Sequence, residues 1–225
     1  MNLLAIDTST DCASVALIIN GELRSESQSC QRSHAQLLLP MVESVLLKAG
    51  VNLKHLDGIA YGRGPGSFTG LRIACSVAKG LAYAADLPLY PVSSLATIAN
   101  EVLTTYKGLQ NPSVLAVIDA RMSELYWTYF NKDNWGINEQ VSPAGKIGLE
   151  PAADSPLIIA GVGYEAYLPQ LDPALRSKIS EHYLIYPKAE AMIRLVLTGT
   201  IKGVSASSAL PFYIRNQITQ GAARG

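Results

Sequence analysis

The strongest indication of the fold comes from residues 58–85, which read GIAYGRGPGSFTGLRIACSVAKGLAYAA. The first four residues are typical of a short strand, and the alanine-rich half from Leu71 to Ala85 is typical of a helix. The glycine loop Gly62–Gly70 connects the two. Because free backbone N–H groups and the helix dipole converge where a helix begins, a strand–loop–helix unit of this kind can hold an anion.

The glycine loop does not match the established phosphate or nucleophile motifs. A P-loop needs the GxxxxGK pattern, and no lysine follows a glycine at that spacing here. A dinucleotide fingerprint needs a glycine where Ser67 stands, and a nucleophile elbow needs its serine centred between two glycines, whereas Ser67 directly follows Gly66. Two interpretations stay open: a phosphate cradle of another kind, or a glycine turn needed for close packing.

The N-terminal residues predict strands and a polar turn. We expect strands at Leu3–Asp7, Cys12–Ile19 and Glu22–Cys30, with a hairpin at Asn20-Gly21, since both turn residues tolerate positive φ. The turn Thr8-Ser9-Thr10 follows Asp7, and several phosphotransferases hold a hydrated metal and a phosphate with a carboxylate and hydroxyls placed in this way. On four residues alone, a polar turn bonded to its own backbone is the stronger interpretation.

A helix is expected to begin at residue 33 or 34 and to run to Ala49, ending before Gly50. Ser33 and Gln36 fit a capping box at its start. Its apolar residues keep helical spacing, but their stripe is wider than one buried face needs. A core helix packed on the sheet is therefore the favoured interpretation, and a helical surface for a partner protein is the alternative.

The strand and helix pattern restarts after residues 104–112, which are the best candidate for a domain boundary. Before it, we expect a strand at Pro88–Val92 and a helix from residue 93 or 94 to Tyr106. After it, strands are expected at 113–119, 124–131 and 157–160, one short strand within 133–156, and helices from about 164 and over 187–201. This alternation indicates an α/β protein with two units, residues 1–108 and 109–225.

Composition excludes several classes of protein. The 225 residues are 48% hydrophobic and 16% charged, which argues against disorder. Residues 1–106 carry 7 basic and 8 acidic side chains and residues 107–225 carry 11 and 10, so a chain that binds nucleic acid by itself is not expected. Three cysteines without a CxxC pair, and no run near the ~18 apolar residues of a membrane span, predict a soluble cytoplasmic protein with no membrane segment.

Side chains for catalysis are sparse. The three histidines lie too far apart in sequence for a zinc site on one helix or turn, and no Ser–His–Asp or Cys–His arrangement is suggested by spacing. These histidines are His34, His55 and His182. The corner formed by Asp119, Arg121 and Glu124 could hold a ligand, but a surface turn is the stronger interpretation.

Several segments together carry a family resemblance. They are Leu3–Thr10, Ser33–Pro40, Gly62–Arg72, Pro91–Leu95, Asp119–Arg121 and the closing Pro211–Arg215. Together they closely resemble the bacterial TsaB (YeaZ) family. The resemblance is dense over about residues 2–125, and the GRGPGSFTGLR string is long enough to be highly specific.

The resemblance implies a fold and a function. The fold is that of acetate and sugar kinases, heat-shock proteins and actin (ASKHA), which has two similar α/β lobes. The function is that of a non-catalytic scaffold for the catalytic paralogue TsaD, with the ATPase TsaE, in threonylcarbamoylation of adenosine 37 in ANN-decoding tRNAs. TsaC supplies the threonylcarbamoyl-adenylate. The resemblance also implies that the protein contacts tRNA only through the complex and that the free protein forms a homodimer.

The resemblance further implies that catalytic and metal-binding residues are missing. TsaD carries an HxxxH metal pair in the segment that resembles Pro91–Ala99, where this chain has Ser94 and Ile98. Neither residue can replace imidazole as a metal ligand. No intrinsic cofactor is implied, and ATP or ADP at the partner interface is left open. The alternatives are a nucleotide-hydrolysing ASKHA enzyme and a glycoprotease-like peptidase, for which no nucleophile or metal set is evident.

Two sets of residues are predicted to carry function. Partner contact is expected on the helices over about 34–49 and 69–85, although their small residues could instead pack inward on the sheet. The predicted contacts are His34, Leu37, Leu38, Met41, Val45, Gly70, Ala74, Ala78 and Ala82. The residues predicted to meet a phosphate or nucleotide are Asp7, Thr8, Ser9, Gly64, Gly66 and Ser67.

Overall fold

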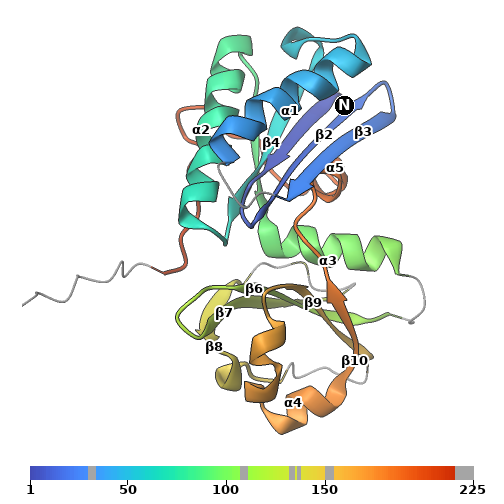
Figure 1. Ribbon diagram of the computed structural model, residues 1–225. Coiled ribbons are helices and arrows are strands. Elements are labelled where there is room, and N and C mark those ends of the chain that lie inside the picture. Colours follow the sequence, from blue (N-terminus) through green and yellow to red (C-terminus); the bar gives the residue numbers. More distant parts are fainter. Residues whose placement is uncertain (30–33, 107–110, 132–134, 136–137, 150–154, 216–225) are drawn as a thin grey trace, which may run out of the picture.

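The computed structural model describes residues 1–29, 34–106, 111–131, 135, 138–149 and 155–215. Two five-stranded sheets form its framework (Figure 1). The first sheet has the order β3-β2-β1-β4-β5, and its strands are β1 (Leu3–Asp7), β2 (Cys12–Ile19), β3 (Glu22–Ser29), β4 (Gly58–Gly64) and β5 (Leu89–Ser93). The second has the order β10-β9-β6-β7-β8, and its strands are β6 (Ser113–Asp119), β7 (Glu124–Phe130), β8 (Gln140–Pro143), β9 (Leu157–Val162) and β10 (Ile179–Leu184).

The two sheets have the same topology. In the first, β1 pairs antiparallel with β2 and parallel with β4, and β2–β3 and β4–β5 continue these two directions. In the second, β6 pairs antiparallel with β7 and parallel with β9, again with β8 and β10 at the edges. The chain therefore has the two-lobed α/β architecture of the ASKHA fold.

The helices form layers around these sheets (Figure 1). The outer face of the first sheet is covered by α1 (His34–Ala49) and α2 (Phe68–Ala85). Between the two sheets lie α3 (Ser94–Thr105) and α5 (Ala189–Leu197). The far face of the second sheet is covered by short elements: the 3-10 helices η2 (Ala144–Lys146) and η3 (Glu165–Gln170), and α4 (Pro173–Lys178). A further 3-10 turn, η1 (Leu53–His55), precedes β4.

One apolar core joins the two sheets. It takes Leu3 and Ala5 from β1, Ile98 from α3, and Ala116 from β6, with α5 completing it. All five residues of β1 are buried because helices cover both faces of the strand. The halves of the chain are thus packed on a common layer of two helices, and a large apolar interface of this kind opposes movement of one half against the other.

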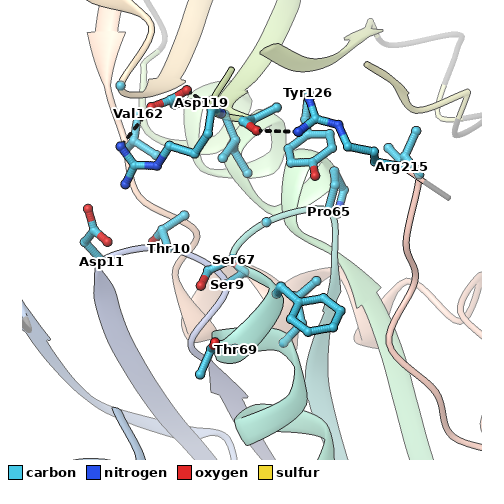
Figure 2. Close-up of a pocket in the computed structure, with 18 of the residues that line it drawn as sticks. Ser9, Thr10, Asp11, Pro65, Ser67, Thr69, Asp119, Tyr126, Val162 and Arg215 are labelled. Carbon is cyan, nitrogen blue, oxygen red and sulfur yellow. Dashed lines mark hydrogen bonds and ion pairs between the residues drawn. The ribbon is translucent and has the colours of Figure 1, made fainter. Parts of the chain in front are cut away.

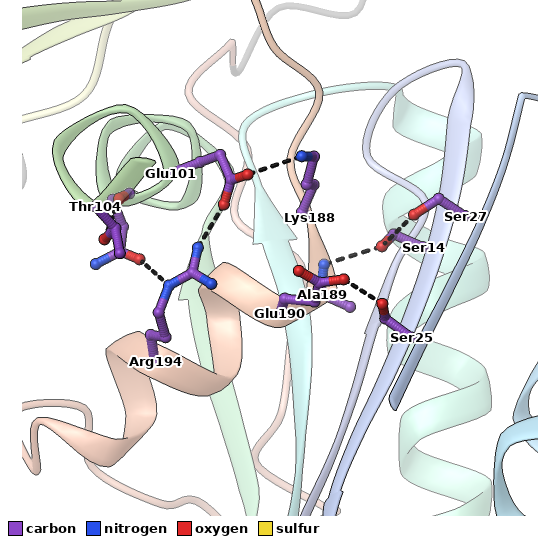
Figure 3. A network of polar contacts seen from close by, with 10 residues as sticks. Ser14, Ser25, Ser27, Glu101, Thr104, Lys188, Ala189, Glu190 and Arg194 are labelled. Carbon is purple, nitrogen blue, oxygen red and sulfur yellow. Dashed lines mark hydrogen bonds and ion pairs between the residues drawn. The ribbon is translucent and has the colours of Figure 1, made fainter. Parts of the chain in front are cut away.

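Polar contacts reinforce this middle layer (Figure 3). Glu101 on α3 accepts a hydrogen bond from Lys188 at 2.7 Å and is also paired with Arg194 on α5. Burial acts to raise the pKa of Glu101, but the two cations hold it below its usual value. At the start of α5, the Ala189 N–H donates to Ser14 Oγ on β2 at 3.0 Å. The helix that follows the second sheet is therefore fastened to the first.

A partly buried ion pair also crosses between the halves. Arg63, at the end of β4, donates from Nη2 to Glu139 Oε2 at 2.9 Å, and Ser93 donates to the same carboxylate. Burial raises the pKa of Glu139, against the lowering effect of Arg63 and Ser93. The arginine of the glycine loop thus holds the segment that enters β8.

Most element types were predicted correctly, but several boundaries were wrong. The helix α2 begins at Phe68, three residues before the predicted start, because the Ser67 side chain caps it. The helix predicted from about residue 164 is the 3-10 helix η3, and the one predicted over 187–201 is the shorter α5. The elements α4 and β10 were not predicted. Ser33, the predicted cap of α1, lies outside the described residues.

The boundary between residues 108 and 109 stays a prediction. Each sheet lies on one side of it, while α5 packs with α3 against the first sheet. Within the described part of the chain, no helix has both the length and the apolar character needed to cross a membrane.

Candidate functional site

A pocket of about 760 Å³ opens between the two sheets (Figure 2). It lies where the parallel strands β1, β4, β6 and β9 end, which is where α/β folds usually bind ligands. The first half contributes Ser9, Thr10, Asp11, Pro65, Gly66, Ser67, Phe68, Thr69 and Leu71. The second half contributes residues 118–122, Tyr126, Val162, Gly163, Glu165, Leu184, Tyr186 and the C-terminal residues 212–215.

The floor of the pocket is built by packing the glycine loop against the turn after β1. A Cβ on Gly62 would lie 1.9 Å from Asp7 Oδ2, one on Gly66 2.2 Å from the Ser9 carbonyl oxygen, and one on Gly70 1.8 Å from the Thr8 carbonyl oxygen. No real side chain fits at such distances, so the three glycines are required for this contact. The close-packing interpretation of the loop is confirmed, and its role as a phosphate cradle stays a prediction.

Hydrogen bonds fix the same contact. The Ser67 N–H donates to the Ser9 carbonyl at 2.7 Å, and the Thr8 hydroxyl donates to the Gly70 carbonyl at 2.7 Å. The Ser67 side chain in turn accepts from the Gly70 N–H and caps α2. The start of α2 is therefore held directly over the end of β1.

Asp7 lies beneath this floor and is completely buried. Its Oδ1 accepts hydrogen bonds from the backbone and the hydroxyl of Ser9 at 2.9 and 2.8 Å, whereas its Oδ2 has no partner among the described residues. Burial raises the pKa of Asp7 to about 6, although the bonds from Ser9 act in the opposite direction. The carboxyl group therefore titrates closer to neutral pH than an exposed aspartate does, and it is not among the residues that line the pocket.

Of the six residues predicted to contact a phosphate, some line the pocket and others are packed away from it. Ser9, Gly66 and Ser67 line the pocket. Asp7 and Thr8 are buried below it, and Gly64 packs against Leu71 and the Phe212 carbonyl. Ser9 is itself almost fully buried and its hydroxyl donates to Asp7, whereas Gly66 is partly exposed and Ser67 exposed. Whether any of the six binds a phosphate stays a prediction.

The hairpin between β6 and β7 forms the opposite wall, where sequence reasoning favoured a plain surface turn. The Asp119 carboxylate accepts from the Arg121 N–H at 2.7 Å and from the Tyr167 hydroxyl at 3.0 Å, and pairs with the Arg121 guanidinium at 3.2 Å. Arg121, Met122 and Ser123 all adopt positive φ, at 60°, 55° and 61°. Such a run of non-glycine residues stores backbone strain, which concentrates at functional sites.

The pocket lining is mixed in charge and rich in aromatic side chains. Its acidic residues are Asp11, Asp119 and Glu165, and its basic residues are Arg121 and Arg215. Its aromatic residues are Phe68, Tyr126, Tyr186, Phe212 and Tyr213. Sequence reasoning missed the aromatic residues, because they come from four separated segments and no spacing signal relates them.

The two positions that the family resemblance matches to the HxxxH pair of TsaD lie outside this pocket. Ile98 is fully buried in the core between the sheets. Ser94 is also buried, and its hydroxyl has no hydrogen-bond partner in the described part of the chain. Over the same residues, no group of three or more His, Cys, Asp or Glu side chains could hold a metal ion.

The residues predicted to contact a partner are mostly turned inward. Leu38, Met41 and Val45 on α1, and Ala74, Ala78 and Ala82 on α2, are buried, and so is Gly70. His34 and Leu37 are partly buried. The small residues of α2 thus face the sheet, which was the alternative interpretation of their spacing. Partner contact by this face stays a prediction, and any direct contact must be made by exposed neighbours.

These exposed neighbours form a second stripe that sequence reasoning missed. On α1 they include Leu39 and Leu47, which are 49% and 71% exposed. On α2 they include Ser76, Gly80 and Tyr83, and Tyr83 is 85% exposed. A Cβ added to Gly80 would meet no atom within 4 Å. Small residues occur at four-residue spacing on both sides of α2, so the spacing alone could not show which side faces the sheet.

Comparisons with known proteins show the family. A family model described as TsaD, tRNA N6-adenosine threonylcarbamoyltransferase, matches residues 25–196. The chain is 36% identical to the tRNA threonylcarbamoyladenosine biosynthesis protein TsaB of Escherichia coli, over 97% of this chain and 96% of that protein. The TsaB protein of Haemophilus influenzae is 34% identical over 97% and 95%. The solved structure of YeaZ from Pseudomonas aeruginosa superposes with a TM-score of 0.83 at 37% identity, covering 94% and 99%.

The contact between glycine loop and turn predicts opposite effects for two substitutions in one helix. Gly70→Ala should lower the free energy of unfolding by about 3 kcal/mol or more, because its Cβ would collide with the Thr8 carbonyl. Gly80→Ala should raise it by about 0.5–1 kcal/mol, since alanine favours a helix and meets open space. Urea unfolding measures both, and equal effects would contradict the proposed packing.

The burial of Asp7 predicts that removing its charge stabilises the folded protein, and that the effect grows as the pH rises. With its pKa raised from 3.8 to about 6, the carboxyl group favours the folded state when protonated, and this contribution is lost as the pH rises through about 6. Asp7→Asn keeps the shape and removes the charge, so its stability relative to wild type should increase by about 1 kcal/mol between pH 5 and pH 8. Urea unfolding at both pH values tests this.

The matched control is Asp11→Asn, which changes an exposed carboxylate in the same turn. It should show no such increase between the two pH values. A constant difference between Asp7→Asn and wild type across this range would show that Asp7 is already paired or solvated in the folded protein.

Proposed function

We propose a function from the premise that this chain belongs to the TsaB (YeaZ) family of tRNA threonylcarbamoyladenosine biosynthesis proteins. The chain acts as a non-catalytic scaffold for a TsaD-type transferase, with TsaE, in the threonylcarbamoylation of adenosine 37 of ANN-decoding tRNAs. The observation that carries the scaffold role is the outward face of α1 and α2, where Leu39, Leu47 and Tyr83 are exposed within the described part of the chain.

The composition of this face suits a helical partner. Ser76, Gly80 and Ala84 on α2 are exposed and small, and they follow one another at four-residue spacing. Such a stripe allows a second helix to approach closely, while the flanking Leu47 and Tyr83 supply apolar contacts. Aromatic residues near the centre of an interface often carry much of the binding energy. The same face supports pairing of two copies when TsaD is absent.

Two observations support a non-catalytic role, and a third concerns the tRNA contacts. Ile98 occupies the core at one position aligned with the metal-binding pair of TsaD, and Ser94 is buried away from the pocket at the other. The Asp7 carboxylate is covered by Gly62 and does not face the pocket. The balance of 18 basic and 18 acidic side chains supports leaving the tRNA contacts to the partner subunits in a cytoplasmic complex.

The pocket leaves room for a nucleotide within this proposal. Its volume of about 760 Å³ is in the range of small-molecule sites, and its aromatic lining could stack on a base. We place ATP or ADP here as a ligand of the assembled complex and propose no intrinsic cofactor. Calorimetry of the isolated protein with ATP and Mg²⁺ separates this from the alternative of a nucleotide-hydrolysing enzyme, which requires tight binding and turnover by this chain alone.

Reconstitution tests the scaffold role. Modification of an ANN-decoding tRNA by TsaC, TsaD and TsaE should proceed at least tenfold faster when this chain is added, and the chain should show no transfer activity without TsaD. Threonylcarbamoyladenosine is measured by mass spectrometry of the digested tRNA. Full activity of the other three proteins without this chain would overturn the proposal.

A double variant tests the surface. Leu47→Glu with Tyr83→Glu should weaken binding to TsaD by at least tenfold, since it places two carboxylates on the exposed face, and should shift the free protein to the monomer. Both side chains are exposed, so the fold should be unaffected. Leu197→Glu, at an exposed leucine on α5, is the matched control. Unchanged affinity of the double variant in a sedimentation or calorimetric titration would place the interface elsewhere.

A further inference from the structure

The last described residues form a strap along one side of the pocket. The chain returns from α5 past β5 and α2 and then reaches the second sheet, and we call residues 210–215 the C-terminal strap (Figure 1). The residues before it are firmly attached. Val204 and Leu89 exchange two backbone hydrogen bonds of 2.8 Å, and the buried Ala209 accepts a bond from Lys79 at 3.1 Å.

The strap itself buries little apolar surface. Leu210 is 69% exposed, Phe212 41% and Tyr213 36%. Three hydrogen bonds attach it to the first half: Tyr61 donates to the Leu210 carbonyl at 3.1 Å, the Phe212 N–H donates to the Arg63 carbonyl at 2.7 Å, and Arg72 donates to the Tyr213 hydroxyl at 3.2 Å. Two ring contacts add to them, because the Arg63 guanidinium lies 4.5 Å from the centre of the Phe212 ring and the Phe68 and Tyr213 rings are 5.3 Å apart. Segments held in this way have low local unfolding free energies.

Arg215 attaches the strap to the second half. Its guanidinium donates to the Ala120 carbonyl at 3.2 Å, pairs with the Glu124 carboxylate and contacts Met122 Sδ at 3.4 Å. All three partners belong to the hairpin between β6 and β7 that forms the pocket wall. At this edge of the pocket, the Arg215 side chain therefore joins the strap to the second half. Figure 2 shows Arg215 beside Tyr126.

The strap is also a wall of the pocket, because Phe212, Tyr213, Ile214 and Arg215 all line it. The rest of the wall cannot move easily. The two sheets share one apolar core through α3 and α5, and the partly buried Arg63–Glu139 pair joins the two halves again. Opening by rotation of the halves would disrupt that core, whereas release of the strap would break a few partly exposed contacts.

We propose that residues 210–215 are a gate to the pocket and that Arg215 is its latch. Release of Arg215 from Glu124 and Ala120 frees the strap, which then swings away about its fixed point at Ala209 and opens the pocket on that side. Val204 keeps its bonds to β5 and Ala209 keeps its bond to α2 during this movement. The gate is a property of this chain's own contacts and does not depend on the proposed function.

Amide hydrogen exchange of the full chain tests the gate. In Arg215→Ala, the Phe212 N–H should exchange at least tenfold faster than in wild type, because its bond to Arg63 opens with the strap. The Val204 N–H, bonded to Leu89 behind the fixed point, should keep its rate and serves as the internal control. Glu124→Gln, which removes the charge partner, should act in the same direction.

Arg176→Ala is the matched control, since it removes an exposed arginine on α4. Chymotrypsin provides a second readout: cleavage after Tyr213 should be at least tenfold faster in Arg215→Ala than in Arg176→Ala, with the rest of the chain intact. Unchanged exchange at Phe212 and unchanged cleavage would show that the strap is held without Arg215. Equal acceleration at Val204 and Phe212 would show general unfolding. Either result overturns the gate.

Discussion

The packing of glycine backbone on the turn after β1 is the constraint on which the rest of the structure depends. Parallel strands β1 and β4 lie side by side, so the segments that leave them compete for the same space. Gly62, Gly66 and Gly70 resolve this because each lacks the Cβ that would strike Asp7, Ser9 or Thr8. With this contact made, α2 can begin directly over β1, and its direction sets both the outer helical face and the floor of the pocket.

The same topology occurs twice, but its two copies are joined by a shared layer. In each sheet a central strand has an antiparallel partner on one side and a parallel one on the other. The inner faces of both sheets pack on α3 and α5, so neither face is complete without the other half. For this reason the two halves pack as one body, with the pocket between them. Conformational change at the pocket is confined to its edge, where the hairpin at Arg121 and the C-terminal strap meet.

Sequence reasoning predicted local features well and long-range placement poorly. Periodicity and turn chemistry located β1, β2, β6 and α1 to within a residue, since these signals depend on neighbours in the chain. The edge strand β10 was missed, because half of its side chains are exposed and its pairing with β9 is a tertiary effect. The glycine loop was identified, but what it packs against was not, because nothing in residues 62–70 encodes the position of Thr8. The wall supplied by Tyr126, Tyr186 and Phe212 had no sequence signal for the same reason.

The unequal cover of the two sheets decides where a partner can bind. The outer face of the first sheet carries helices of 16 and 18 residues, whereas that of the second carries elements of 3, 6 and 6 residues. Two long helices side by side present a continuous surface on which side chains repeat every turn, which short irregular elements cannot offer. The inward rows of α1 and α2 are already used by the first sheet, so the outward row is free to meet another chain. A duplicated fold thus becomes asymmetric, with one half presenting a surface and the seam between the halves forming the pocket.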